Sequence, residues 1–166
     1  LPQIINSNKP TYLRIGKKNE KIVYTKKCKS KLGEPNIIKK GKDICIFSTG
    51  NILCNSIEAV SNLNKRGINP QIVNIHSIKP INEKKIIKFL KKFKKIITVE
   101  EHVDKGGLGS ILKKICAENQ SNNIFVSHNA GNKFLVGAGD NNNAHKILKI
   151  DSKSIKKSIL KLNKMK

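Results

Sequence analysis

Residues 97–112, which read ITVEEHVDKGGLGSIL, bring together side chains that could do chemistry. An apolar run ends in two glutamates and a histidine, and three glycines follow before the apolar residues resume. If residues 96–102 form a strand and its end, Glu100 and Glu101 point to opposite faces of a sheet. The two carboxyl groups then cannot act as the acid and the base of one reaction, and at most one of them lines a cleft.

His102 follows the glutamates, and it suits a general base, a hydrogen-bonding residue or a polar residue in a turn. Gly107 and Gly109 resemble a phosphate-binding GxGxxG loop only loosely, because position 112 is leucine and no acidic residue ends a following strand. A helix that begins here would still attract an anion to its positive end. The favoured interpretation is that small residues let this helix pack close to a sheet or to a partner.

The apolar pattern around this stretch predicts strands that alternate with helices. Short apolar runs typical of buried strands occur at residues 43–48, 70–75, 96–99 and 124–126. Helical spacing and capping residues predict helices that begin near Leu53, Asn82, Leu108 and Asp151, and Gly67 is expected to end the first of them. The alternation predicts an α/β fold, a three-layer α/β/α arrangement around an open, mostly parallel sheet of about five strands.

The first 40 residues carry weaker signals. They predict two short strands, TYLRIG at 11–16 and IVYT at 22–25, and then a polar linker at 26–36. We expect residues 1–40 to be the end of a preceding domain with its linker, and residues 41–166 to be one α/β domain. The N-terminus reads like the middle of a longer chain.

The charge of the chain is strongly positive, with 34 Lys and Arg against 11 Asp and Glu and a net charge of +23. A basic module that binds nucleic acid is therefore one alternative. Base recognition favours arginine and stacking aromatics, yet only Arg14 and Arg66 are arginine and aromatics make up 4% of the residues. We expect salt-sensitive adhesion to polyanions and no specific binding of nucleic acid. The high charge is interpreted as the result of an A+T-rich genome, whose codons favour lysine.

Cysteine and histidine spacing gives no sign of a metal site. Four cysteines lack CxxC spacing and are interpreted as small buried thiols in a reducing compartment, which favours the cytoplasm: Cys28, Cys45, Cys54 and Cys116. Three further histidines share no metal spacing and are interpreted as loop or core residues: His76, His128 and His145. The lysine-rich run at 84–95 has a narrow apolar stripe, which suits a helix that covers a sheet better than one on a membrane.

Three stretches together resemble the end of a thiamine-diphosphate-dependent enzyme of the transketolase family. PTYLRIGK at 10–17 resembles the closing strand of its pyrimidine-binding domain. Residues 41–87, from GKDICIF to KKII, resemble the start of its C-terminal domain, and residues 97–112 resemble its strand-to-glycine-helix junction. The resemblance covers about residues 8–118, while residues 123–145 depart from the family's usual pattern.

The resemblance implies a C-terminal, dimer-supporting domain of an enzyme that transfers a two-carbon ketol unit between sugar phosphates. Thiamine diphosphate and Mg²⁺ would be bound by upstream polypeptide, and this segment alone would bind neither and catalyse nothing. The implied partners are the thiamine-binding domain or subunit and further copies, in a homodimer or a heterotetramer.

The resemblance also assigns roles to individual residues. Arg14 corresponds to an arginine that binds the substrate phosphate, and four residues correspond to interface positions: His102, Gly106, Gly107 and Gly109. YLRIG and EEHVDKGGLG are most similar to transketolase and its split two-subunit form. Deoxyxylulose-phosphate synthase and the β subunit of 2-oxo acid dehydrogenases remain alternatives, as does a complete small phosphate-binding enzyme.

Overall fold

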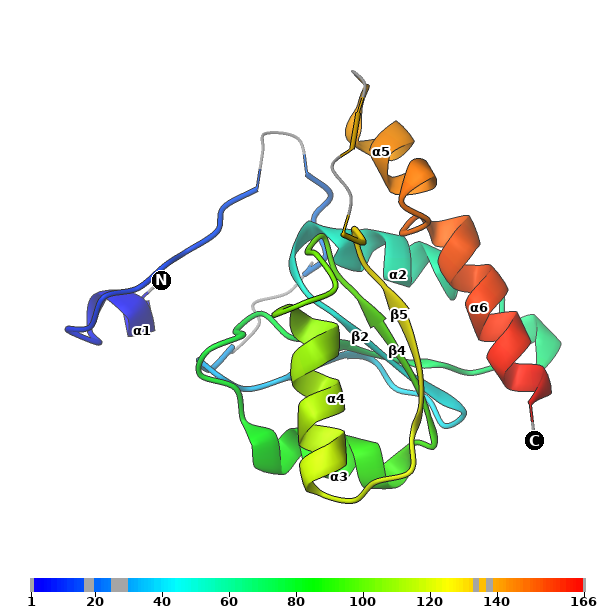
Figure 1. Ribbon diagram of the computed structural model, residues 1–166, viewed down its shortest axis with the longest axis horizontal. Coiled ribbons are helices and arrows are strands. Elements are labelled where there is room, and N and C mark those ends of the chain that lie inside the picture. Colours follow the sequence, from blue (N-terminus) through cyan, green and yellow to red (C-terminus); the bar gives the residue numbers. More distant parts are fainter. Residues whose placement is uncertain (1, 17–19, 25–29, 133–134, 137–138, 166) are drawn as a thin grey trace.

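A five-stranded sheet lies at the centre of the molecule (Figure 1). The computed structural model describes residues 2–16, 20–24, 30–132, 135–136 and 139–165. The strands are β1 (Asn36–Lys39), β2 (Ile44–Ser48), β3 (Gln71–Asn74), β4 (Lys95–Val99) and β5 (Ile124–His128). Their order across the sheet is β1-β3-β2-β4-β5. The strands β2 to β5 are parallel, and β1 pairs with β3 in the antiparallel direction at one edge.

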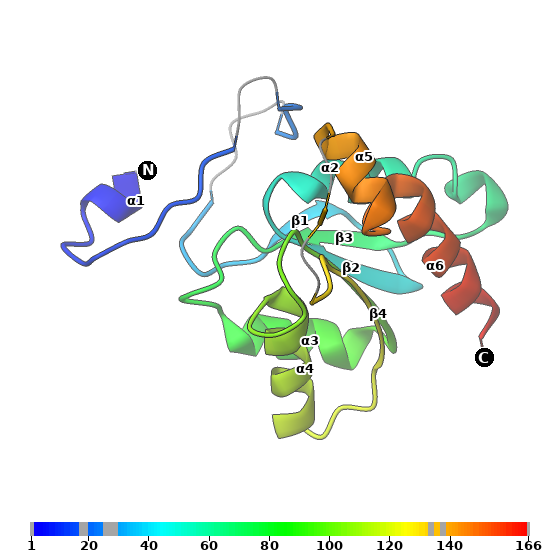
Figure 2. The ribbon, with the colours of Figure 1, turned by 45° about the horizontal axis from the view of Figure 1, so that its top comes forward.

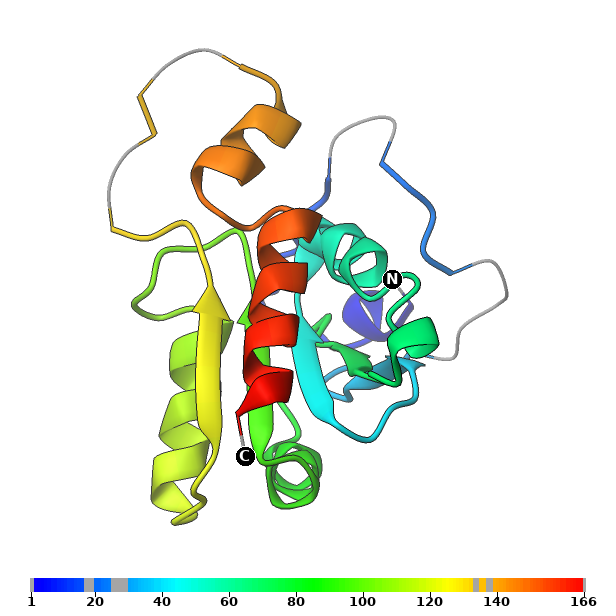
Figure 3. The ribbon, with the colours of Figure 1, turned by 90° about the vertical axis from the view of Figure 1, so that its right-hand side faces the viewer.

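Helices cover both faces of this sheet (Figure 3). The helices are α1 (Pro2–Ile5), α2 (Leu53–Ala59), α3 (Glu83–Lys92), α4 (Leu108–Glu118), α5 (Asn141–Ile147) and α6 (Ser152–Lys164), with 3-10 turns η1 (Gly50–Ile52) and η2 (Asn64–Arg66). The helices α3 and α4 lie on one face, whereas α2 and α6 lie on the other. The predicted three-layer, mostly parallel fold is therefore confirmed.

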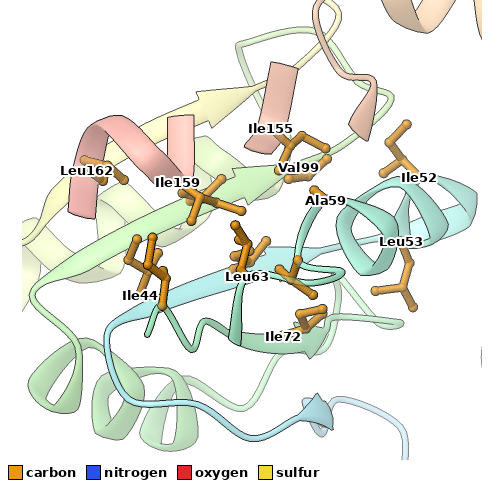
Figure 4. Packing of buried hydrophobic residues seen from close by; sticks show 14 of the residues in the cluster. Ile44, Ile52, Leu53, Ala59, Leu63, Ile72, Val99, Ile155, Ile159 and Leu162 are labelled. Atoms are coloured by element: carbon orange, nitrogen blue, oxygen red, sulfur yellow. The ribbon is translucent and has the colours of Figure 1, made fainter. Parts of the chain in front are cut away.

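Alternating side chains of the strands form two cores, one on each face. On β2, Ile44 and Ile46 point toward α2 and α6, whereas Cys45 and Phe47 point toward α3 and α4. Figure 4 shows how α6 contributes to the first core, through Ile155, Ile159 and Leu162. Burying each large apolar side chain contributes about 1.5–3 kcal/mol, so both faces of β2 must stay covered.

Helix boundaries follow the predicted caps with one correction. Asn82 caps α3 by accepting a hydrogen bond from the backbone N–H of Lys85, and Asp151 caps α6 in the same way. The helix predicted to run from Leu53 toward Gly67 ends at Ala59 instead. Asn62 adopts a φ of 62°, which an α-helix does not tolerate, so the chain re-forms only as the short turn η2.

The prediction of strands at 11–16 and 22–25 is wrong, since residues 11–16 and 22–24 form no strand. Residue 25 lies outside the described ranges. A strand needs a neighbour for its backbone groups and apolar side chains. Here Tyr12 is 90% exposed and Ile15 is 80% exposed. Figures 1 and 2 show α1 and the chain that directly follows it lying apart from the sheet.

Two elements were not predicted. The strand β1 is short, lies at the sheet edge and ends in lysine, so its sequence looks like linker. It lies before residue 41, where the sequence pattern places the domain boundary.

The helix α5 begins in three asparagines, which are poor helix formers, and it depends on Asp140, whose carboxylate accepts a hydrogen bond from the backbone N–H of Asn143.

The lysine-rich run at 84–95 covers the sheet, since Ile86 and Leu90 are buried while the lysines of α3 face solvent. Within the described ranges, no helix is long and apolar enough to cross a membrane. Cys45 and Cys116 are buried free thiols and Cys54 is a half-buried one. Cys28 lies outside the described residues.

His128 connects the end of β5 to α6 and to the turn before it. Its Nδ1 lies 2.7 Å from the carbonyl oxygen of Lys149, and its Nε2 lies 3.0 Å from the hydroxyl of Ser158. The carbonyl can only accept, so Nδ1 carries the proton and Nε2 accepts from the serine. Burial lowers the pKa of His128, although the Lys149 carbonyl and Asp151 oppose the shift.

We expect His128 to make stability depend on pH. Because the pKa of His128 is lower in the folded state than its ordinary value of 6.5, the unfolded chain binds a proton first as the pH falls. Its contribution is therefore complete above pH 7 and lost as the pH falls through 6.5, with a slope of at most about 1.4 kcal/mol per pH unit.

Urea unfolding between pH 5 and 8 measures this effect. His128→Asn keeps a donor for Lys149 and does not titrate, so its stability should vary less with pH than that of the unchanged protein. His76→Asn, which alters an exposed histidine, is the control. Equal pH slopes for the unchanged protein and His128→Asn would contradict the assignment.

Candidate functional site at the carboxyl edge of the sheet

The carboxyl ends of β2 and β4 mark the point where a sheet of this topology offers a crevice. From β2 the chain passes to β3 on one side, and it later returns to β4 on the other side. Ligands of open α/β sheets bind outside the strand ends at such a point. The loops that border it are residues 49–51 and residues 100–106, so the EEH stretch lies at this crevice.

Glu100 does not face the crevice, because its carboxylate is turned under α4. The side chain is buried, and its two oxygens accept hydrogen bonds from the backbone N–H groups of Leu108 and Gly109, at 2.6 and 2.8 Å. These N–H groups have no partner inside the helix, and the helix dipole favours a negative charge beside them. The anion site expected at this helix start is therefore occupied by a residue of the chain itself.

The glycines of the junction make room for that carboxylate. A Cβ atom at Gly107 would lie 2.1 Å from Glu100 Oε2, which is a clash. A Cβ atom at Gly109 would lie 2.9 Å from Thr98 Oγ1 and 3.2 Å from Glu100 Oε1. Gly106 instead supplies a turn with a φ of 80°. Close packing of α4 on the sheet, which the small residues predict, is confirmed.

Glu101 points to the opposite face, as its neighbouring position on the chain predicts. Its Oε1 lies 2.8 Å from Nε2 of His145 on α5, and its Oε2 lies 3.6 Å from Nη2 of Arg14. The amide nitrogen of Asn55 on α2 lies 3.2 Å from Nδ1 of the same histidine. Arg14 and His145 thus meet at Glu101, and Asn55 joins this group through His145.

The N-terminal segment crosses the same edge of the sheet. The amide of Asn51 donates a hydrogen bond to Glu20, and Cys54 Sγ lies 3.9 Å from the carbonyl oxygen of Lys21. Further along, the amide of Asn74 donates to the hydroxyl of Tyr24, at 2.8 Å. With Arg14 at Glu101, these contacts place residues 14–16 and 20–24 beside the ends of β2, β3 and β4. The strand ends at which open α/β sheets bind ligands are therefore in contact with the protein's own chain.

The residues singled out from the sequence are only partly brought together. Arg14 lies beside Glu101, and its side chain is 64% exposed. His102 is exposed, and its Nδ1 lies 3.0 Å from the backbone oxygen of Val103. Gly106 is exposed as well, whereas Gly107 and Gly109 are buried inside this chain. A contact with another chain can therefore reach the first glycine directly, but the other two only through the position of α4.

His145 and Asn55 were not recognised as site residues from the sequence. His145 shares no metal spacing with the other histidines and lies in a segment without a clear pattern, so nothing along the chain connects it to Glu101. Among the described residues, no group of three His, Cys, Asp or Glu side chains is arranged to hold a metal ion. The edge thus offers one arginine for an anion and, within those residues, no ligand set for a cation.

Comparisons with known proteins give a consistent family. Residues 33–155 match the model of the transketolase C-terminal domain. The 1-deoxy-D-xylulose-5-phosphate synthase of Clostridium beijerinckii is 30% identical over 159 residues, which are 95% of this chain and 26% of that protein. The putative transketolase C-terminal section of Methanocaldococcus jannaschii is 31% identical over 156 residues, 91% of this chain and 47% of that protein.

A third relative is one of the subunits of the apulose-4-phosphate transketolase of Actinobacillus succinogenes, 28% identical over 96% of this chain and 51% of that protein. Among solved structures, a split-gene transketolase described as an inactive β4 tetramer has the same fold, with a TM-score of 0.74 and 22% identity. That match covers 86% of this chain and 45% of the other chain. The present chain thus spans between about a quarter and a half of these proteins.

Glu100 should be more important for stability than any other glutamate of this region. Glu100→Gln keeps the size but places an amide NH₂ against one of two backbone donors, so the free energy of unfolding should fall by roughly 1–3 kcal/mol. The measurement is chemical denaturation at pH 7. Glu118→Gln, at the exposed other end of α4, is the matched control and should change stability by less than about 0.5 kcal/mol. Equal stabilities for Glu100→Gln and the unchanged protein would contradict this role.

Proposed function

The chain belongs to the transketolase C-terminal domain family, and we propose that it is the C-terminal domain of a transketolase-like enzyme. In this proposal the whole enzyme transfers a two-carbon ketol unit between sugar phosphates, and the chain supports the assembly without catalysing alone. The observation that carries the proposal is the family match across residues 33–155. The match of two transketolase subunits or sections along nearly the whole chain supports it further.

The geometry of the carboxyl edge agrees with a supporting role. A catalytic α/β domain would keep the crevice at β2 and β4 open for its ligand. Here Arg14, Glu20 and Tyr24 contact the residues that follow or end these strands, and Glu100 occupies the anion-binding start of α4. The residues described do not fit a metal, so we assign thiamine diphosphate and Mg²⁺ to the partner domain or subunit and derive no step through them here.

The N-terminal segment is the part of the chain that we expect to contact that partner. It exposes large apolar side chains on an unpaired backbone: Ile5, Tyr12, Leu13, Ile15 and Ile22. Exposed apolar surface of this kind marks sites of association. We propose that the segment before β1 completes the preceding pyrimidine-binding domain, where residues 11–16 gain the strand neighbour that they lack here. Of the residues 1–40 that the sequence pattern assigns to that domain, β1 belongs to the sheet described above. His102 and Gly106, which are both exposed, are proposed to lie in the interface of a homodimer or heterotetramer.

Arg14 is the residue that we propose contacts substrate. Its guanidinium carries five N–H donors in a planar fork that fits a phosphate group in a bidentate way. Glu101 approaches only one terminal nitrogen of that fork, and the side chain is largely exposed. The arginine can therefore bind a phosphate on a sugar that sits between this chain and its partner. We also propose a cytoplasmic location, which the free thiols of Cys45, Cys54 and Cys116 suit.

A second candidate function follows from relatives named 1-deoxy-D-xylulose-5-phosphate synthase, of which four are 30–32% identical to this chain. An enzyme of that kind makes a sugar phosphate whose first carbon is a methyl group, whereas ketol transfer makes one with a hydroxymethyl group. The product of the assembled enzyme therefore separates the two candidates.

The first test is reconstitution. The chain is purified alone and together with the polypeptide from the same genome that carries the family's diphosphate-binding domain, and transfer from a ketose phosphate to an aldose phosphate is followed by product analysis. We expect activity only with both components, and no heat of binding when the chain alone is titrated with thiamine diphosphate and Mg²⁺. Turnover by the chain alone would refute the supporting role, and formation of 1-deoxy-D-xylulose 5-phosphate would favour the second candidate.

The second test concerns Arg14 in the assembled enzyme. Arg14→Ala should raise the KM for phosphorylated substrates about tenfold or more, because a charge-assisted hydrogen bond to the phosphate is lost. It should leave the KM for an unphosphorylated short aldehyde unchanged. Arg66→Ala removes the other arginine of the chain and serves as the matched control. If both variants behave alike, Arg14 has no role at the site.

A further inference from the structure

We infer that His145 is a positioning residue for Arg14 and acts through Glu101. The inference rests on the proposed phosphate-binding role of Arg14. The inference adds His145, a residue of the separate helix α5, and holds that His145 keeps the guanidinium of Arg14 available to a phosphate.

The first step is the orientation of the His145 ring. The amide nitrogen of Asn55 lies 3.1 Å from the carbonyl oxygen of Ile150 and 3.2 Å from Nδ1 of His145. An amide nitrogen can only donate, so Nδ1 of the histidine accepts and the proton lies on Nε2. Asn55 thereby fixes both the ring and its tautomer, from a helix that belongs to the sheet's own covering layer.

The second step is the direction of the Glu101 carboxylate. The Nε2–H group of His145 donates to Oε1 at 2.8 Å, and both side chains are mostly buried, with 15% and 22% of their surface exposed. The hydrogen bond therefore lies largely out of solvent and holds the carboxylate by one oxygen. Only Oε2 remains on the side of Arg14.

The third step is the distance to Arg14. Nη2 lies 3.6 Å from Oε2, whereas a bidentate pair of arginine and carboxylate closes to about 2.7–2.9 Å at two nitrogens. Glu101 thus attracts the guanidinium to the edge of the sheet without capturing its fork. The guanidinium of Arg14 is therefore already positioned when a phosphate binds, and most of the N–H donors of the guanidinium remain open to it.

Loss of the histidine donor should change this balance. Without His145, both oxygens of Glu101 can turn toward Arg14 and accept hydrogen bonds from two nitrogens of its guanidinium. The carboxylate then competes with the phosphate for the same donors. The expected result is weaker binding of phosphorylated substrate, with no change in the chemical step. A histidine with only a structural role in holding α5 would affect all substrates alike.

The experiment uses the assembled enzyme and compares His145→Leu with His145→Gln. His145→Leu should raise the KM for a phosphorylated sugar about twofold to fivefold, the size expected for a solvent-accessible ion pair, and leave kcat and the KM for an unphosphorylated aldehyde unchanged. His145→Gln keeps an N–H donor near the position of Nε2 and should restore the original KM. His76→Leu, at an exposed histidine, is the control.

A double-mutant cycle identifies the route of the effect. In a Glu101→Ala background, His145→Leu should have no further effect on KM, because there is no carboxylate left to release. An unchanged KM for His145→Leu, a lowered one, or an effect that persists without Glu101 would overturn the inference. If Arg14→Ala itself leaves KM unchanged, the phosphate role fails and this inference with it; if only the His145 variants are silent, the proposed function stands and the inference alone fails.

Discussion

The buried carboxylate of Glu100 is the interaction on which the carboxyl edge of this sheet depends. It accepts hydrogen bonds from two of the backbone donors that the start of α4 leaves unpaired, those of Leu108 and Gly109. In exchange, the chain needs glycine at position 107, since a side chain would occupy the space of the carboxylate. The glycine-rich junction is thus shaped by an internal anion, which explains why it looks like a phosphate loop but lacks the spacing of one.

Other polar groups along this edge of the sheet are also paired with groups of the same chain. The loops after β4 and β5 are joined where the backbone N–H of Ala130 donates to the carbonyl of His102, and residues 14–16 and 20–24 contact the ends of three strands. Polar groups at this edge are thus used for contacts within the chain. An edge built in this way, with one exposed arginine beside it, suits the supporting role that we propose.

The sequence predicts the parts of this structure that depend on local patterns. Buried strands such as β2 are continuous apolar runs, and Asn82 and Asp151 cap their helices through residues three positions away or fewer. The opposite directions of Glu100 and Glu101 follow from the geometry of an extended chain. Elements that depend on distant partners were missed or wrong: β1 exists only because β3 offers a free edge, and the predicted strand at 11–16 has no neighbour within the described residues.

The same distinction explains the candidate site. Arg14 was found from a motif, but the residues around it come from three other segments, and no spacing along the chain predicts their meeting. Asn55 looks like any polar residue on a helix, and His145 like a loop histidine, until the fold places both within hydrogen-bonding distance of one another. Asn55 and His145 act through geometry. The carboxylate of Glu101, held by one oxygen, attracts Arg14 without forming a bidentate pair with it. The phosphate binding that we propose for Arg14 would therefore depend on the folded arrangement as well as on the arginine motif.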